Sequence, residues 1–381
     1  NKMHIEPFVG LRMSSGDCPL TDTISSPQAL NAISTITVHG IAHTKGDDAT
    51  DCPLRMTRVA IPKMKRQIHQ PYEPNISPHG YPEVAPSRLP PEGDYHVELS
   101  LDPLKQTVGC EENGNYGRCG HVFAATPTSW SDSSTGPCHG PSTLTGRLPP
   151  LAVKIARFGY KRELLLEASV YKELEHLQGV SIPRCYGLFE GELKDGWERV
   201  SVKSEYEDWG TGKDECAQIS DLPLEFNSLP EEQYIKLWDE KLELATQELR
   251  FNRAHNGPGG SNTVMLLLLE RLGGRLPIGV DLGSELRADL HALFEDMATQ
   301  GVVYYDIRYF NILQPLPNPP GFPGRICPYH HRRHLWRIID FSHYVYKVAL
   351  TMEFMNDNNA RNVNRFLGCL EGGEMFEFAH C

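Results

Sequence analysis

Five polar side chains lie at positions where burying a charge is costly or where their oxygen atoms can bind a ligand. Lys154 stands in the middle of a short apolar segment, and Glu167 falls on the apolar stripe of a predicted helix. A buried carboxylate is costly unless a cation meets it, so we expect these two side chains to pair. Asn311 follows Asp306 by five residues, and Asp340 ends a second apolar segment. Taken singly, each has an ordinary explanation, since Lys154 and Glu167 could reach solvent and Asp306 and Asn311 could cap turns.

The apolar pattern predicts the elements that would position these side chains. Apolar residues repeat at steps of three and four over 161–178 and over 284–300, which predicts two helices, and Gly301 ends the second one. Short apolar or alternating runs predict strands over 95–101, 120–125, 151–156, 187–189, 264–270 and 335–339. Lys154 would therefore lie on a strand, Glu167 on the first helix, and Asp340 just after the last strand.

The chain divides by composition into three parts. Residues 1–95 are predicted to form a Pro-rich, partly disordered arm, because eight prolines fall between Pro62 and Pro91 and proline removes a backbone donor. Residues 96–280 contain most of the predicted strands, interrupted by an insertion at about 191–262 whose first half has little periodicity. Residues 281–381 carry the second helix and the segments around Asp306 and Asp340.

The order of these features resembles the protein-kinase-like superfamily, and more narrowly the kinase-like proteins abundant in mushroom-forming fungi. The similarity covers about 96–342 and is carried, in chain order, by Gly117, Gly120, Lys154, Glu167, the strand at 264–270, Asp306, Asn311 and Asp340. It implies an α+β protein with a two-lobed protein-kinase-like fold. The N-lobe would be β-rich, the C-lobe helical and truncated, and a largely irregular N-terminal arm would precede both.

The resemblance implies an ATP site made of Gly117, Gly120, Val122, Lys154, Glu270 and Leu272. The two glycines would let the backbone close over the phosphates, where a Cβ would collide. Lys154 would hold the α- and β-phosphates, and Glu167 would hold Lys154 in place. Backbone groups next to Glu270 would meet the adenine, although a buried strand explains those side chains equally well.

The resemblance also implies a catalytic group, made of Lys154, Glu167, Asp306 and Arg308, and a metal site. Asp306 would accept or orient the proton of the attacking hydroxyl, and Arg308 would bind the γ-phosphate through its guanidinium. Asn311 and Asp340 would hold magnesium, which prefers hard oxygen ligands. The implied cofactors are ATP and Mg²⁺.

Several positions depart from the kinase pattern. Tyr304 and Tyr305 replace the usual His-Arg, Ser342 replaces the glycine of Asp-Phe-Gly, and no Ala-Pro-Glu segment follows. We expect a kinase that transfers the γ-phosphate of ATP to a hydroxyl, of the Ser/Thr protein kinase type. Two alternatives remain: a small-molecule kinase of the aminoglycoside or choline kinase type, and a pseudokinase that acts as a binding module.

Charge and hydropathy argue against two classes of partner. The chain has 49 acidic and 37 basic residues, a net charge of −12, whereas nucleic-acid binders are usually basic. Its longest apolar run, 264–269, falls far short of the roughly 20 residues of a membrane helix. We therefore expect neither nucleic acid nor a membrane as a partner, and the resemblance implies ATP and an unidentified protein or small-molecule acceptor. Ten scattered cysteines and no secretory signal favour an intracellular location, with the cytoplasm preferred over the nucleus.

A second polar group occurs late in the chain, where Cys327, His330 and His334 stand at steps of three and four. Such ligands and spacings suit zinc. No fourth ligand is evident near them, and the stretch lies in a Pro-rich region with Arg332 and Arg333. A solvated basic loop is therefore the favoured interpretation.

Overall fold

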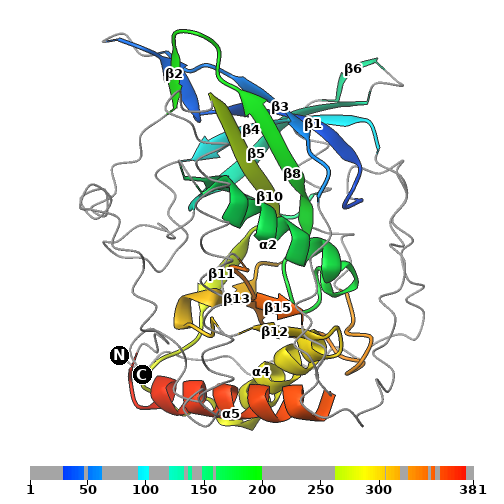
Figure 1. Ribbon diagram of the computed structural model, residues 1–381, viewed down its shortest axis with the longest axis vertical. Coiled ribbons are helices and arrows are strands. Elements are labelled where there is room, and N and C mark those ends of the chain that lie inside the picture. Colours follow the sequence, from blue (N-terminus) through cyan, green and yellow to red (C-terminus); the bar gives the residue numbers. More distant parts are fainter. Residues whose placement is uncertain are drawn as a thin grey trace, which may run out of the picture.

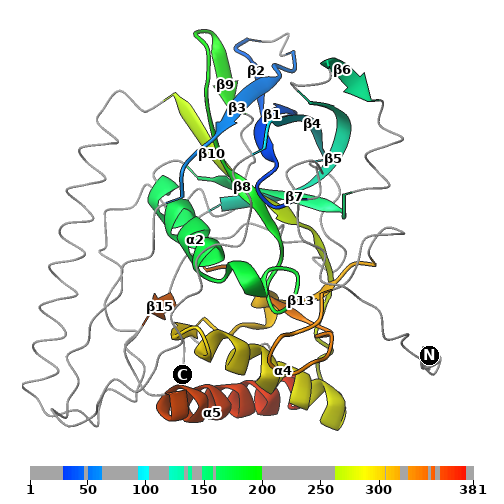
Figure 2. The same ribbon diagram turned by 90° about the vertical axis from the view of Figure 1, so that its right-hand side faces the viewer.

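The computed structural model describes residues 29–46, 50–61, 93–102, 120–132, 136–139, 148–157, 160–199, 262–304, 306–317, 325–341, 345–347 and 352–374. Figures 1 and 2 show two views at right angles. Most of the insertion expected at 191–262 and the proline-rich stretch after residue 62 lie outside these ranges. The expected loop glycine Gly117 also lies outside them.

Seven strands form a closed barrel, the upper part of the molecule in Figure 1. In order around the barrel they are β4 (Tyr95–Asp102), β1 (Ile33–His39), β3 (Leu54–Arg58), β8 (Cys185–Glu192), β10 (Thr263–Glu270), β7 (Leu151–Ala156) and β5 (Gly120–Asp132), and β5 pairs with β4 to close the ring. β6 (Gly136–His139) extends β5 at one edge, and β2 (Ala42–Thr44) pairs with β9 (Trp197–Arg199). Fully buried apolar side chains, such as those of Ile36, Leu99 and Leu266, form the core of this part.

The expectation of a two-lobed protein-kinase-like fold is wrong. The chain forms a closed, sheet-rich barrel, and among the described residues only three α-helices occur. The expectation of an irregular N-terminal arm is also wrong in part. β1 and β3 precede residue 95, and both belong to the ring, where they lie between β4 and β8. The alternation of apolar residues that reveals a strand is disturbed in β1, where the pairing register with β4 shifts between Ile33 and Thr35. Ser and Thr on the other face of β1 further lower its hydropathy.

Two helices and a three-stranded sheet lie below the barrel in Figures 1 and 2, and a third helix, α2 (Lys161–Glu173), lies against the lower part of the barrel. α2 continues into the 3₁₀ turn η1 (Glu175–Leu177) and contacts β7, β8 and β10. α4 (Gly283–Ala298) packs against α5 (Met352–Glu371). Both helices predicted from periodicity are therefore present, within a few residues of the expected bounds.

Short strands carry the polar residues between these helices. β11 (Leu272–Arg275), β13 (Ile312–Pro315) and β14 (Arg337–Ile338) form one small sheet, and β12 (Val302–Tyr304) pairs with β15 (Val345–Lys347). The 3₁₀ turn η4 (Tyr309–Asn311) leads into β13. A second apolar cluster joins α2, α4, α5 and these strands, so it fixes the loops that connect them. In the ranges that the structure covers, no helix combines the length and apolarity needed to cross a membrane.

Ile36→Ala is expected to lower the free energy of unfolding by about 3 kcal/mol, because it removes a fully buried side chain of β1 and leaves a cavity. Thr57→Ala, at an exposed position of the neighbouring β3, should change it by less than about 0.5 kcal/mol. Urea denaturation followed by circular dichroism measures both. If both substitutions changed the free energy of unfolding by the same small amount, the placement of β1 in the barrel would be wrong.

Candidate functional site

Lys154 is a buried cation held between two carboxylates. It lies on β7, next to Val122 of β5 and Leu267 of β10 in the pairing register. Its Nζ atom is 2.6 Å from Glu167 Oε2 and 2.7 Å from Asp340 Oδ1. Burial by itself would lower the pKa of Lys154, but the two carboxylates outweigh it, and the pKa lies above its usual value. Lys154 is therefore a fixed positive charge at neutral pH.

Glu167 reaches Lys154 from α2. The residues that share its helix face, Val170, Tyr171 and Leu174, are buried in the core, so the carboxylate is carried inward with them. The Glu167 side chain is only 1% exposed. The ion pair that the sequence predicts from the cost of burying this carboxylate is present in the structure.

Asp340 approaches Lys154 on the turn that follows β14. Its backbone φ is 63°, a left-handed conformation that costs a residue other than glycine about 1–2 kcal/mol. The next residue, Phe341, is fully buried and makes edge-on ring contacts with Tyr171 and Tyr304, with centroids 5.3 Å and 5.6 Å apart. These contacts hold the turn in place. The side chain of Asp340 stays 30% exposed and can meet a ligand.

Asp306 and Asn311 lie between β12 and β13 and are hydrogen-bonded to each other. Asn311 Nδ2 donates to the backbone oxygen of Asp306 at 3.0 Å and to Asp306 Oδ2 at 3.2 Å. It also donates to Tyr304 Oη at 3.0 Å, and Tyr304 Oη donates to the backbone oxygen of Ile339 at 2.9 Å. Tyr304 therefore ties the loop that carries Asp306 to the residue before Asp340. In the sequence Tyr304 stands out only as a departure from the kinase pattern, so this positioning role was missed.

The carboxyl group of Asp306 has an unusual environment. The residue is 5% exposed, and its Oδ1 forms an ion pair with Arg308 Nε. Burial raises the pKa of Asp306 to about 6, against the lowering effect of Arg308, and the negative charge of Asp340 raises it further. A carboxyl group with this pKa is mainly ionised at pH 7 and is a stronger base than an ordinary aspartate.

Three of the residues predicted to bind ATP lie on strands: Gly120, Val122 and Leu272. Gly120 and Val122 lie on β5 beside β7, and a Cβ at Gly120 would be 2.8 Å from the backbone oxygen of Ile155. Glycine at 120 is thus required by the close approach of two strands, independently of any ligand. Leu272 is buried at the start of β11.

Glu270, which was predicted to lie beside the adenine, is bonded to Arg184. Its Oε1 is 3.0 Å from Arg184 Nη1, its Oε2 accepts the Arg184 amide, and its own amide donates to the Arg184 backbone oxygen at 2.8 Å. The amide of Arg271 donates to the backbone oxygen of Pro150. Neither of these two amides is free for an adenine ring, so the predicted role of the segment must use other groups.

The structure joins the predicted site residues in two groups of direct contacts. Lys154, Glu167 and Asp340 form the first group, and Asp306, Asn311 and Arg308 form the second. The hydroxyl of Tyr304 links them, and the charge of Asp340 acts on Asp306. Oxygen atoms of both groups suit magnesium: the three donor bonds of Asn311 all use Nδ2, which leaves Oδ1 as a hard ligand, and Asp340 supplies a carboxylate.

Comparisons with known proteins do not assign the chain to a family. No protein-family model matches the sequence, and no curated protein is significantly similar to it. The resemblance to kinase-like proteins remains an interpretation of the motifs. The function has to be inferred from the geometry of the cluster around Lys154.

Proposed function

We propose that the chain is an ATP- and Mg²⁺-dependent phosphotransferase that transfers the γ-phosphate of ATP to a hydroxyl group. The observation that carries the proposal is the position of Lys154, within 2.7 Å of carboxylate oxygens of both Glu167 and Asp340. Phosphoryl transfer needs little covalent chemistry from a protein, so catalysis depends on positioning and on compensating the charge of the phosphates. A rigid cation beside oxygen ligands for a metal can supply both.

The charges in the cluster are compatible with a bound metal. When all are ionised, Lys154 and Arg308 contribute two positive charges, and the carboxylates of Glu167, Asp306 and Asp340 contribute three negative ones, a net charge of −1. ATP would supply the phosphoryl group, and the divalent charge of Mg²⁺ would offset the negative charge of the carboxylates and part of that of the phosphates. Asp340 and Asn311 would hold the metal, and Lys154 would hold the phosphates.

Asp306 would take up the proton of the attacking hydroxyl. Its raised pKa makes it a competent acceptor at neutral pH, and the bonds from Asn311 fix the position of its carboxyl group. Arg308 stands beside it and would attract the transferring phosphate while keeping Asp306 ionised. The proposed acceptor is a Ser or Thr hydroxyl of a protein.

Transfer of label from γ-labelled ATP tests this proposal. Purified protein with Mg²⁺ should transfer label to serine or threonine of a generic protein acceptor, and Asp306→Asn should lower the transfer about a thousandfold. Asp357→Asn, at an exposed position of α5, is the matched control and should leave transfer unchanged. If label is found only in small molecules, the acceptor is a metabolite and the proposal of a protein acceptor is wrong. ATP binding without any transfer would contradict an enzymatic role and favour a binding module.

The pH dependence of transfer should show the titration of Asp306. Because the base must be ionised, kcat/KM should fall about tenfold for each pH unit below about 6. Arg308 lowers this pKa, so Arg308→Gln should move the acid limb to higher pH in addition to lowering the rate. Initial rates measured from pH 4.5 to 8.5 give both profiles, because this range of about four pH units includes the expected pKa of Asp306. An acid limb at the same pH in both proteins would contradict Asp306 as the base.

A further inference from the structure

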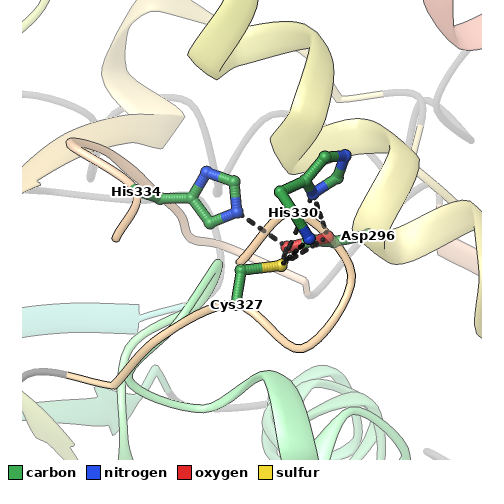
Figure 3. Close-up of side chains that lie close together, drawn as sticks. All are labelled: Asp296, Cys327, His330 and His334. Carbon is green, nitrogen blue, oxygen red and sulfur yellow. Dashed lines mark hydrogen bonds and ion pairs between the residues drawn. The ribbon is translucent and has the colours of Figure 1, made fainter. Parts of the chain in front are cut away.

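A second cluster of ligand-type side chains lies apart from the residues around Lys154 (Figure 3). Cys327, His330 and His334 belong to the segment 325–336 that precedes β14, and Asp296 projects toward them from α4. Cys327 is fully buried, and the side chain of His334 is 0% exposed. The solvated basic loop favoured by the sequence is therefore wrong at these positions. The fourth ligand was missed because it lies 31 residues before Cys327.

The four ligand atoms lie close to one another. Asp296 Oδ1 is 3.1 Å from Cys327 Sγ and 3.0 Å from His330 Nδ1, and Sγ is 3.4 Å from the same Nδ1. His334 Nε2 is 3.0 Å from Asp296 Oδ2, and all four ligand atoms lie within 4.8 Å of one another. Zinc bonds of about 2.0–2.3 Å would place tetrahedral ligand atoms about 3.3–3.8 Å apart. The separations of 3.1 Å and 3.0 Å from Asp296 Oδ1 are shorter than this, so binding of an ion would move these side chains apart.

Both histidines are oriented by carboxylates through the ring nitrogen that faces away from the cluster. His334 Nδ1 is 2.7 Å from Asp289 Oδ1, and His330 Nε2 is 3.0 Å from Glu295 Oε2. Asp289 is itself buried and also accepts the amide of Leu335. An outer carboxylate on the second nitrogen is the usual arrangement around metal-bound histidine, because it fixes the tautomer and directs the lone pair of the other nitrogen to the metal.

Two further observations are compatible with a cation between these groups. His334 Nδ1 is held by Asp289, and the completely buried His334 Nε2 pairs with Asp296 Oδ2 at 3.0 Å and has no hydrogen bond to any other described residue. The amides of Tyr329 and His330 both lie 3.4 Å from Cys327 Sγ. Cys327 Sγ in turn donates its thiol proton to Asp296 Oδ1 at 3.1 Å, and a metal would take the place of this proton between the two groups.

We propose that Asp296, Cys327, His330 and His334 bind one Zn²⁺ ion in a closed structural site. Zn²⁺ accepts thiolate, imidazole and carboxylate ligands in tetrahedral geometry, and four protein ligands leave no position for a substrate. The thiol of Cys327 loses its proton to solvent on binding. The thiolate and the carboxylate then balance the two charges of the metal, which lowers the free-energy cost of burying the ion.

The ion would join α4 to the segment that leads into β14 and Asp340. Because that segment has few other regular elements, loss of the metal should loosen the turn on which Asp340 lies. The zinc site itself does not depend on the proposed phosphotransferase activity, and its test does not require that activity.

Metal analysis of the purified full chain tests the site. We expect about one Zn²⁺ per chain after dialysis against a weak chelator, and a loss of about tenfold or more in Cys327→Ser and in His334→Gln. His331→Asn is the matched control: it removes an exposed histidine of the same segment, and asparagine tolerates the positive φ found there. This variant should keep its zinc.

Cobalt substitution keeps the proposal testable if the ligand variants fail to fold. Wild-type protein stripped of metal and loaded with Co²⁺ should show the intense visible bands of a tetrahedral site and a sulfur-to-cobalt charge-transfer band, and Zn²⁺ should displace both. Wild-type protein that contains less than about a tenth of an equivalent of zinc and gives no such bands on Co²⁺ titration would overturn the proposal. In that outcome, the four side chains form only a hydrogen-bonded cluster.

Discussion

Asp306→Asn is expected to make the protein more stable above pH 6 while lowering phosphate transfer about a thousandfold. The loss of transfer follows from the loss of the proton acceptor, since a general base contributes about 10²–10⁴ to the rate. The gain in stability follows from the environment of the carboxyl group. A buried charge that is only partly compensated by Arg308 is replaced by a neutral side chain of the same shape.

The size and the pH range of the stability gain follow from the pKa of Asp306. The carboxyl titrates at about 6 in the folded protein and at 3.8 when unfolded, so the folded state binds its proton more tightly. Ionisation therefore destabilises wild-type protein progressively from about pH 4 to pH 6, by up to about 3 kcal/mol. Below about pH 4 the wild type and Asp306→Asn should be equally stable.

Urea denaturation of the two proteins at pH 4, 6 and 8, combined with transfer rates at pH 8, measures both effects at values that bracket the pKa of about 6. Asp357→Asn, which removes an exposed carboxylate from α5, should change neither quantity. A stability of Asp306→Asn that falls below the wild type at pH 8 would show that the ionised carboxylate stabilises the fold, and it would remove the argument for a raised pKa.

Lys154→Met is expected to destabilise the protein by about 3–5 kcal/mol as well as to abolish phosphate transfer. The substitution removes the cation from between Glu167 and Asp340 and leaves a carboxylate that is 1% exposed without its partner. Burial already raises the pKa of Glu167, so this carboxyl group should take up a proton in the variant. Urea denaturation at pH 7 gives the change in stability.

A second substitution separates the structural role of Lys154 from its role in function. In the double variant Lys154→Met with Glu167→Gln the uncompensated charge of the buried Glu167 is gone, and only the partly exposed Asp340 keeps its charge, so a large part of the lost stability should return. Phosphate transfer should stay at background, because no cation is left to hold the phosphates. If the double variant recovered transfer along with stability, Lys154 would be a purely structural residue.

The sequence predicts the pairing at the site better than it predicts the fold. The pair Lys154–Glu167 follows from local information, namely one charge in an apolar strand and one on an apolar helix stripe, and the structure contains it. The barrel does not follow from such information. Its closure depends on pairing between β4 and β5 and on the insertion of β1 and β3 between β4 and β8, and no periodic pattern along the chain records which strands are neighbours.

Two residues of the proposed sites were equally hidden from the sequence. Tyr304 acts through its hydroxyl, which contacts Asn311 and the backbone of Ile339, and an aromatic residue in a short apolar strand gives no sign of these bonds. Asp296 lies on α4 among buried apolar residues, and its neighbours become evident only when the segment containing Cys327 is placed against that helix. A buried aspartate on an apolar helix face is the signal that could have prompted a search for its partner.

The central claim is that the separated side chains around Lys154 form one site for a triphosphate and its metal. Thermal unfolding with and without ATP and Mg²⁺ tests it most directly, because a ligand at about 100 times its Kd stabilises the native state by about 2.7 kcal/mol. We predict that ATP with Mg²⁺ raises the Tm of the wild-type protein and that Asp340→Asn, compared with its own ligand-free Tm, loses most of this shift. Asp357→Asn should keep the full shift. An absence of any shift in wild-type protein at millimolar ATP, or an equal shift in Asp340→Asn, would contradict the claim.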